Sequence, residues 1–162
     1  MKGTKEVIKL SSNETPLGTS SKALRAIKNS YGNPARYPDG SAVELRKALA
    51  ESNNLNMNNI ICGNGSDEIL SMFANCFAGE GDEIVYSEHG FLVYPIATKA
   101  AGATPVVAKE IKYKANVKEI ISVCTNKTKV CFVANPNNPT GTYLTRNELI
   151  TLRKKLPETC LL

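Results

Sequence analysis

The chain has 162 residues, enough for one domain with a substantial buried core. It is 42% hydrophobic and 22% charged, a composition that argues against a disordered protein. Its net charge of +5 suits an anionic small molecule, but the basic residues are too scattered to favour nucleic-acid binding. The densest basic run, Lys109–Lys118, is expected to be a solvated face.

The sequence predicts neither a membrane protein nor a zinc site. No apolar run approaches the roughly 20 residues of a membrane span, and Met1–Glu6 lacks the apolar core of a signal peptide. None of the five cysteines forms a CxxC pair, and there is a single histidine. An odd number of cysteines fits a reducing cytosol, so we expect a cytoplasmic protein. The cysteines are Cys62, Cys76, Cys124, Cys131 and Cys160.

The first 40 residues predict little regular structure apart from one helix. Residues 1–18 are expected to form an extended arm, because proline and glycine close the segment. A helix is predicted over 20–30, with Ala23, Leu24 and Ile27 on one face. A loop is predicted over 33–40.

Three capping boxes predict the starts of three further helices, over 41–52, from 116 to about 124, and over 145–155. The pairs are Ser41 with Glu44, Asn116 with Glu119, and Thr145 with Glu148. Helices over 66–77 and 92–101 are indicated by apolar residues at helical spacing and by the glycines that follow.

Short apolar runs between these helices predict strands. They cover 60–62, 83–86, 104–108 and 129–133, and 160–162 reads as the start of another. Strands that alternate with helices indicate an α/β fold, a mostly parallel sheet sandwiched by helices. Ligands of such sheets bind at the carboxyl ends of the strands, where two turn-rich segments follow Cys62 and Val133.

The first turn-rich segment, Gly63–Ser66, resembles a phosphate cradle. Two glycines allow a close approach to a ligand, and the first amides of a helix favour an anion. The structural alternative is an ordinary corner between strand and helix in which Ser66 caps the helix. Glu68 stands where a dinucleotide-binding motif has its third glycine, which disfavours that class.

The second turn-rich segment, Asn135–Gly141, holds two prolines, three asparagines and a glycine. The amide group of Asn138 could donate to an anionic oxygen of a ligand above the sheet. The alternative is a purely structural turn.

These segments together resemble a known family. Asn135–Gly141 is similar to the NPNNPTG motif of class I/II aminotransferases, which use pyridoxal 5'-phosphate. Asn13–Pro16, Arg36–Gly40 and Gly63–Glu68 resemble the histidinol-phosphate aminotransferase branch, and the similarity runs from about Leu10 to the last residue. The resemblance implies a partial large domain of the type I fold of pyridoxal-phosphate enzymes.

The resemblance assigns cofactor contacts residue by residue. Ser66, Asp67 and Glu68 would hold the cofactor phosphate, chiefly through their backbone amides. Phe91 would stack on the pyridine ring, with a core aromatic as the structural alternative. Asn138 would donate to the phenolate oxygen of the ring.

The same resemblance implies a homodimer and a small-molecule substrate. Tyr37 would reach the phosphate bound by the neighbouring subunit, and Asn13 would lie near the substrate, although each could be an ordinary loop residue. Leu17 departs from the tyrosine that many relatives carry there. His89 is interpreted as a turn residue.

Transamination also needs a lysine that forms a Schiff base with the cofactor aldehyde, and a carboxylate near the ring nitrogen. In the family both follow the NPNNPTG turn, and neither has a match here, so no catalytic residue is assigned. Ser21-Lys22 lies ahead of the phosphate turn and is not a match. We therefore expect an arm, helix and dimer-contact loop over 1–40, and a truncated cofactor domain over 41–162.

The implied function is transamination of histidinol phosphate with 2-oxoglutarate or glutamate in histidine biosynthesis, with this polypeptide alone inactive. An uncovered strand edge would make it marginally stable or prone to aggregate. The alternatives are an aminotransferase for another amino acid and a non-catalytic module that binds a phosphate ligand.

Overall fold

The computed structural model describes residues 8–32 and 35–162 of the chain. Contacts between Cα atoms divide the chain into two compact units, Met1–Met57 and Asn58–Leu162. The boundary between these units lies after the domain boundary predicted from the sequence, which falls between residues 40 and 41. The division into an arm with a dimer-contact loop and a cofactor domain stays a prediction. Residues 1–7 of the expected arm and 33–34 of the expected loop lie outside the described residues.

The first unit contains two helices, α1 (Ser21–Ser30) and α2 (Val43–Asn53), close to the predicted ranges. The capping box predicted for α2 is wrong. Its N-cap, Ala42, makes no side-chain bond, and the Asp39 carboxylate accepts hydrogen bonds from the Ser41 and Val43 amides, both at 2.9 Å. The carboxylate upstream of the helix thus satisfies the Ser41 amide, one of the two that the box would have used.

The second unit is built on a parallel sheet, as predicted. Strands β1 (Glu83–Ser87), β2 (Thr104–Ala108) and β5 (Thr128–Phe132) lie in the order β2-β1-β5. Both pairings are parallel. Leu161 forms a parallel bridge to Val130, which confirms that the last residues lie alongside the sheet.

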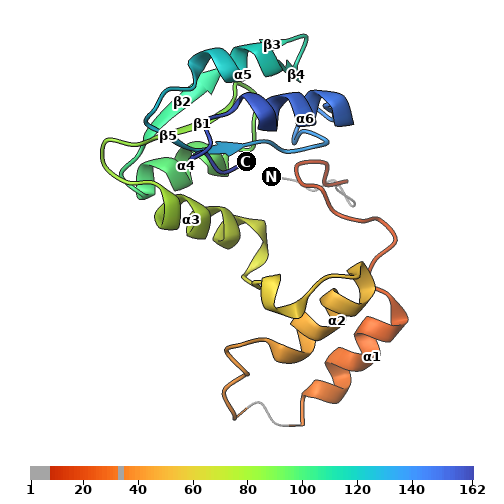
Figure 1. Cartoon of the computed structure of the whole chain (residues 1–162). Helices are drawn as coiled ribbons and strands as arrows, with labels where there is room; N and C mark the ends of the chain where they lie inside the picture. Colours follow the sequence, from red (N-terminus) through yellow and green to blue (C-terminus); the bar gives the residue numbers. More distant parts are fainter. Residues whose placement is uncertain (1–7, 33–34) are drawn as a thin grey trace, which may run out of the picture. The chain divides into compact units, whose positions relative to one another are not determined.

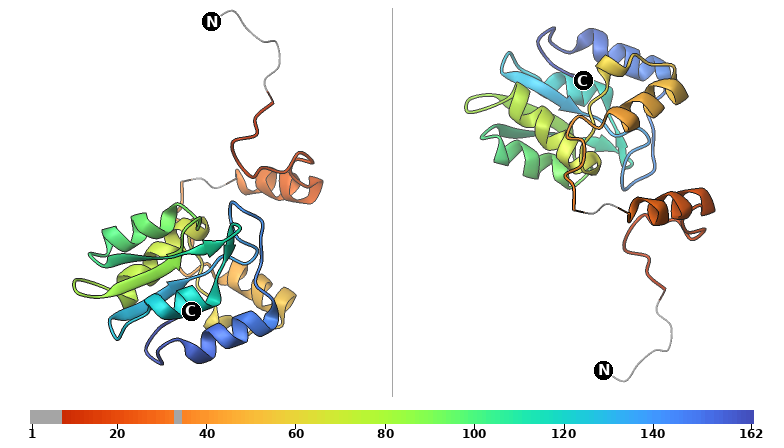
Figure 2. Two further views of the ribbon diagram at one scale, coloured as in Figure 1. Left: turned by 90° about the horizontal axis from the view of Figure 1, so that it is seen from above. Right: turned by 90° about the horizontal axis from the view of Figure 1, so that it is seen from below.

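Helices cover both faces of this sheet. Figures 1 and 2 show α3 (Gly65–Phe77) and α4 (Val93–Ala100) on one face, and α5 (Val117–Val123) and α6 (Arg146–Lys155) on the other. Successive strand residues point to opposite faces, so Ile84 packs toward α3 and α4 while Val85 packs against Ile120 and Leu152. All four side chains have no exposed surface.

The strand predicted over 60–62 is not present. The three-residue 3-10 helix Met57–Asn59 precedes this segment, which pairs with no strand of the described chain. An apolar run needs a neighbour to become a strand, because its backbone groups must be paired. α3 also begins one residue earlier than predicted, at Gly65.

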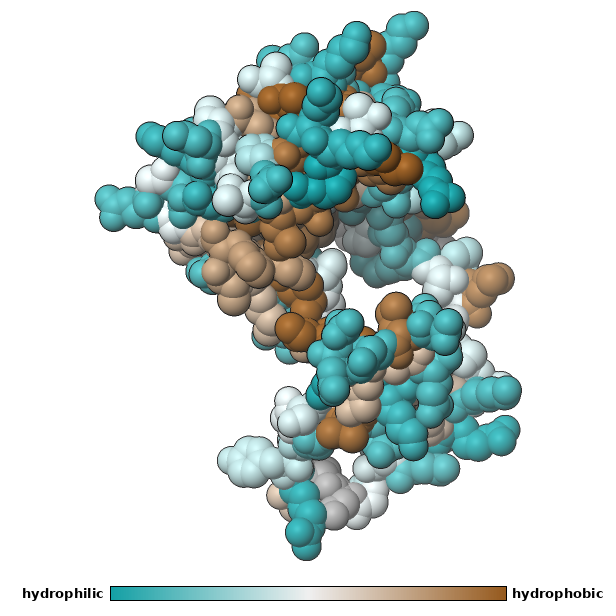
Figure 3. Space-filling model, in the orientation of Figure 1, coloured by the Kyte–Doolittle hydropathy of each residue, from teal (hydrophilic) through white to brown (hydrophobic). Residues whose placement is uncertain are grey.

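Apolar side chains remain on the surface over α3 (Figure 3). They line a groove of about 490 Å³ together with the 59–61 segment.

In residues 8–32 and 35–162, no helix combines the length and apolar character that crossing a bilayer requires.

The two remaining capping predictions had different outcomes. The box at α6 is confirmed, since the Thr145 amide donates to Glu148 Oε2 at 2.7 Å and the Glu148 amide donates to Thr145 Oγ1 at 3.3 Å. At α5, Asn116 caps the helix, but its Oδ1 accepts from the amide of Lys118, the second helical residue, at 3.1 Å. A capping box would use the amide of the third helical residue, Glu119.

A short hairpin, β3 (Glu110–Ile111) and β4 (Lys114–Ala115), interrupts the basic run. Its turn residues Lys112 and Tyr113 have φ of 50° and 61°, which glycine and asparagine adopt more readily. The sequence therefore carries no turn signal there. Lys109, Lys112 and Lys118 are exposed, as expected of a solvated face, whereas the Glu110 side chain in the same run is only 2% exposed.

Candidate cofactor site

Two loops meet at the carboxyl edge of the sheet. β1 and β5 are parallel neighbours, so the turn after β1 and the loop after β5 leave the sheet on the same side. Asn137 Nδ2 donates to the main-chain oxygen of His89 at 3.1 Å and joins them. Phe91 and Asn138, two predicted cofactor residues, thus stand on loops in direct contact.

The three asparagines of the second loop have different roles. Asn135 bonds both the amide and the carbonyl of Leu144, at 2.7 and 3.1 Å. Asn137 is buried and also donates to Thr140 Oγ1 at 3.0 Å. Asn138 is half-buried, and its side chain makes no hydrogen bond to any described residue, so its amide group is available to a ligand.

Phe91 is held from behind by other aromatic rings. Its ring meets the edge of Tyr94 at a centroid distance of 6.1 Å, and Tyr94 stacks on Phe132 at 5.0 Å. Burial, and then Cys131, raises the pKa of Tyr94. A side chain at Gly90 would come within 2.9 Å of the Ser87 carbonyl and 3.0 Å of the Tyr94 ring, so glycine permits this turn. Phe91 itself is half-buried, which leaves part of its ring accessible.

The N-terminus of α3 presents exposed amides. Ser66, Asp67 and Glu68 are exposed, and amides in a first helical turn have no partner within the helix. The N-cap, Asn64, makes no side-chain bond, and Ser66 does not cap the helix. The Glu68 carboxylate instead accepts from the Asn64 amide, and its Oε2 lies 3.0 Å from the position that a Cβ on Gly63 would take. This hydrogen bond therefore holds the negative charge of Glu68 at the turn before the helix.

The first turns of α3 lie over the last strand of the sheet. Ile69 and Leu70 line a cavity of about 230 Å³ together with Phe132 and Val133. This places the predicted phosphate turn in the same compact unit as the two loops. The spacing between the Ser66 turn and Asn138 stays a prediction.

Asn13 and Tyr37 belong to the other compact unit. Both are exposed, and the Tyr37 side chain is completely so. Their roles at the substrate and at a neighbouring subunit also stay predictions.

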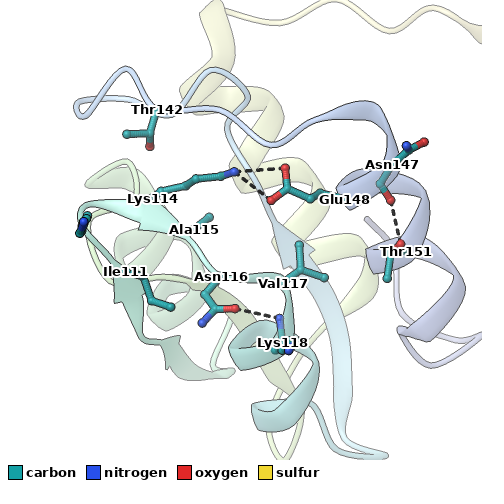
Figure 4. A pocket seen from close by; sticks show the side chains of 11 residues that line it. Ile111, Lys114, Ala115, Asn116, Val117, Lys118, Thr142, Asn147, Glu148 and Thr151 are labelled. Atoms are coloured by element: carbon teal, nitrogen blue, oxygen red, sulfur yellow. Dashed lines mark hydrogen bonds and ion pairs between the residues drawn. The ribbon is translucent and has the colours of Figure 1, made fainter.

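A larger cavity, of about 850 Å³, lies between the hairpin and the start of α6 (Figure 4). The Lys114 side chain extends across it, and Nζ donates to the two carboxylate oxygens of Glu148 at 2.8 and 3.1 Å. This lysine, followed by the Thr145 amide and side chain, lowers the pKa of Glu148 to about 2. No predicted site residue lines this cavity, which is therefore not the predicted cofactor site.

The interpretation of His89 as only a turn residue was incomplete. Its ring nitrogen Nδ1 lies 3.0 Å from Oε2 of Glu110, and its backbone amide donates to Oε1 at 3.0 Å. No local pattern signals this pair, because the two residues are 21 positions apart. In the described part of the chain, no group of three His, Cys, Asp or Glu side chains could hold a metal ion.

Residues 5–162 match the family described as aminotransferase class I and II. The chain is 49% identical over 156 residues to histidinol-phosphate aminotransferase of Paramagnetospirillum magneticum, covering 96% of this chain and 43% of that protein. It is 51% identical over 152 residues to histidinol-phosphate aminotransferase of Erythrobacter litoralis, covering 94% of this chain and 41% of that protein. The chain thus spans about two-fifths of the length of these relatives.

The fold matches that of solved aminotransferases. Histidinol-phosphate aminotransferase from Sinorhizobium meliloti, crystallised in complex with pyridoxal-5'-phosphate, superposes with a TM-score of 0.86 at 24% identity. The match covers 93% of this chain and 41% of that structure. The predicted α/β class, a partial type I fold of pyridoxal-phosphate enzymes, is confirmed by this likeness.

Proposed function

Because this chain belongs to the class I and II aminotransferases, we propose that it forms the N-terminal part of a cofactor site for pyridoxal 5'-phosphate. The observation that carries the proposal is the contact between Asn137 and His89, which brings together the loops of Phe91 and Asn138. The amide group of Asn138, which makes no hydrogen bond to a described residue, would then donate to a ligand held beside Phe91.

The residues present fit the cofactor. The amides of Ser66, Asp67 and Glu68 offer donors and a positive helix end to the phosphate group. The Glu68 carboxylate accepts from the Asn64 amide, so it is not free to oppose the phosphate. Phe91 would cover one face of the ring, and Asn138 would donate to its phenolate oxygen.

When bound, this cofactor acts as an electron sink for the α-carbon of an amino acid. The described residues would bind and orient it. We infer that the substrates are histidinol phosphate and glutamate or 2-oxoglutarate, since relatives that carry this name are 49% and 51% identical. Asn13 would lie near the substrate. We also infer that the protein works in the cytoplasm, as its odd number of cysteines suggests.

We also infer a homodimer. Tyr37 makes no contact that buries it, and its hydroxyl would reach the cofactor phosphate of a second copy. A Tyr37→Phe variant is expected to keep the fold and weaken cofactor binding only at concentrations where the dimer forms.

Equilibrium dialysis with pyridoxal 5'-phosphate tests the site. Removing one hydrogen bond to a charged group with Asn138→Ala should weaken binding by about tenfold. The matched control is Asn126→Ala, because Asn126 is an exposed asparagine that precedes β5, at its opposite end. Equal binding by both variants, or equal affinity for inorganic phosphate and for the cofactor, would contradict the proposal. The second result would favour a module that binds only phosphate.

We expect the purified 162-residue polypeptide to have no transaminase turnover. The reason is chemical, since no lysine in it has the context that the family uses to bond the cofactor. Steady turnover of histidinol phosphate with 2-oxoglutarate would refute this expectation.

A further inference from the structure

The β3–β4 hairpin joins both loops of the candidate site. From one strand, the Glu110 carboxylate accepts from the backbone amide of His89 and from its ring nitrogen Nδ1, each at 3.0 Å. From its turn, the Tyr113 carbonyl accepts from Thr142 Oγ1 at 2.9 Å. The hairpin thus contacts the turn after β1 through Glu110 and the loop after β5 through Tyr113.

The contacts close into a ring. His89 accepts from Asn137, Asn137 donates to Thr140 Oγ1, and Thr140 Oγ1 lies 2.8 Å from Thr142 Oγ1. The Tyr113 ring meets the His89 ring edge-on at a centroid distance of 5.1 Å. Both loops that carry a residue expected to contact the cofactor ring, Phe91 or Asn138, are therefore bonded to the hairpin.

Glu110 is the buried member of this ring of contacts. Its side chain is 2% exposed, whereas that of His89 is 46% exposed. A carboxylate only accepts, so the proton of the imidazole lies on Nδ1 and the backbone amide of His89 supplies the second donor. A buried carboxylate bound twice to one residue fixes both the backbone and the ring of that residue.

The hairpin is itself anchored. Lys114, on its second strand, forms the ion pair with Glu148 at the start of α6. Glu88, the residue before His89, pairs instead with exposed Lys109, and its carboxylate makes no hydrogen bond to either loop among the described residues. The two carboxylates therefore differ in their partners, since Glu88 binds a surface lysine and Glu110 binds His89.

We propose that Glu110 is a positioning residue for the cofactor ring, acting through His89 to hold the loops that carry Phe91 and Asn138. The proposal rests on the proposed function. Glu110 would act through His89 and not by touching the cofactor, and the Ser66 turn, which would take the phosphate, has no bond to the hairpin among the described residues. Loss of Glu110 therefore affects recognition of the ring and spares recognition of the phosphate.

The test measures two affinities on Glu110→Ala. Affinity for pyridoxal 5'-phosphate, from equilibrium dialysis, should fall by about tenfold, as for the loss of a charged hydrogen bond. The inhibition constant of inorganic phosphate, from competition in the same dialysis, should stay within about twofold, because no bond to the Ser66 turn is lost. Amide hydrogen exchange should accelerate at residues 89–91 and 137–142.

Three further variants separate positioning from general stability. Glu110→Gln should recover most of the affinity, since its oxygen still accepts from the His89 amide and its NH2 group can donate to Nδ1. Glu88→Ala, the matched control, should bind like the unaltered chain. In an Asn138→Ala background, Glu110→Ala should cost much less than it does alone.

The outcomes are distinct. A parallel loss of affinity for the cofactor and for phosphate, or no change in Glu110→Ala, overturns the positioning role. If the unaltered chain binds no pyridoxal 5'-phosphate, the proposed function fails and this proposal fails with it. If the unaltered chain binds pyridoxal 5'-phosphate, but Glu110→Ala costs as much affinity in the Asn138→Ala background as it does alone, only the positioning role is overturned.

Discussion

Glu148 takes part in two interactions that hold the start of α6. One of its carboxylate oxygens lies 2.8 Å from Lys114 Nζ, and the other accepts from the Thr145 amide at 2.7 Å. The capping box of α6 and the anchor of the β3–β4 hairpin therefore share a single side chain. The lysine and the Thr145 donors lower the pKa of this carboxylate to about 2, against 4.5 for an ordinary glutamate.

The first prediction concerns acid stability. A folded-state pKa below the unfolded value stabilises the fold above about pH 4.5, and the effect is lost as pH falls toward 2. Glu148→Gln should therefore flatten the dependence of the melting temperature on pH across this window. Lys114→Met should remove part of the same dependence, and the double variant should lose less than the sum. An unchanged pH profile in Glu148→Gln would contradict the assignment.

The second prediction concerns the cap of α2. The Asp39 carboxylate accepts from the Val43 and Ser41 amides, and these bonds lower its pKa. Asp39→Ala should lower the protection of amides against hydrogen exchange in the first turn of α2, and in the unaltered chain the same protection factors, which correct for the intrinsic pH dependence of exchange, should fall as pH falls below 3.8. The matched variant Ser41→Ala should leave this protection unchanged, because the Ser41 side chain makes no hydrogen bond to any described residue. A stronger effect of Ser41→Ala would restore the capping box expected from the sequence.

These two caps show where sequence reasoning succeeds and where it stops. Thr145 and Glu148 satisfy each other across one turn, so three residues of spacing are enough to find the helix start. Ser41 and Glu44 have the same spacing, but the Asp39 carboxylate, upstream of the helix, accepts from the Ser41 amide that the box would have used. Local patterns identify candidate donors and acceptors without ranking competitors.

Non-local partners explain the other differences. β1 and β2 lie where their apolar runs predict, since each has a parallel neighbour. The run at 60–62 has equal apolar character but no neighbouring strand in the described chain. At the candidate site, the family resemblance pointed to Phe91 and Asn138, whose roles stay predictions. The bond between His89 and Asn137 joins positions 48 apart and left no trace in the sequence.

The third prediction concerns the core between the sheet and α5. Ile120 is completely buried and packs in one cluster with Val85 and Leu152. Ile120→Ala should lower the free energy of unfolding by about 2–5 kcal/mol, because it removes buried methylene groups and leaves a cavity. Ile150→Ala is the control, since Ile150 is 43% exposed and a surface substitution changes stability by about 0.5 kcal/mol or less. Urea unfolding followed by circular dichroism measures both, and equal losses would contradict the packing.

The last prediction concerns the apolar groove beside α3. Ile61 is 76% exposed and Phe77 is 50% exposed, and both line the groove of about 490 Å³. Exposed apolar surface of this kind binds hydrophobic dyes and promotes association. The double variant Ile61→Ser with Phe77→Ser should therefore show weaker fluorescence of the dye ANS and less self-association in sedimentation, with little change in melting temperature.

The control for the groove is Ile96→Ser on α4. Ile96 is 58% exposed and does not line the groove, so Ile96→Ser removes one isoleucine from another surface and is compared with the single variant Ile61→Ser. If Ile96→Ser reduces dye binding and self-association as much as Ile61→Ser does, total apolar exposure controls the behaviour of the chain and the groove has no special part in it. If Ile61→Ser changes them and Ile96→Ser does not, the groove beside α3 is the source of association, because the same substitution is made at both positions.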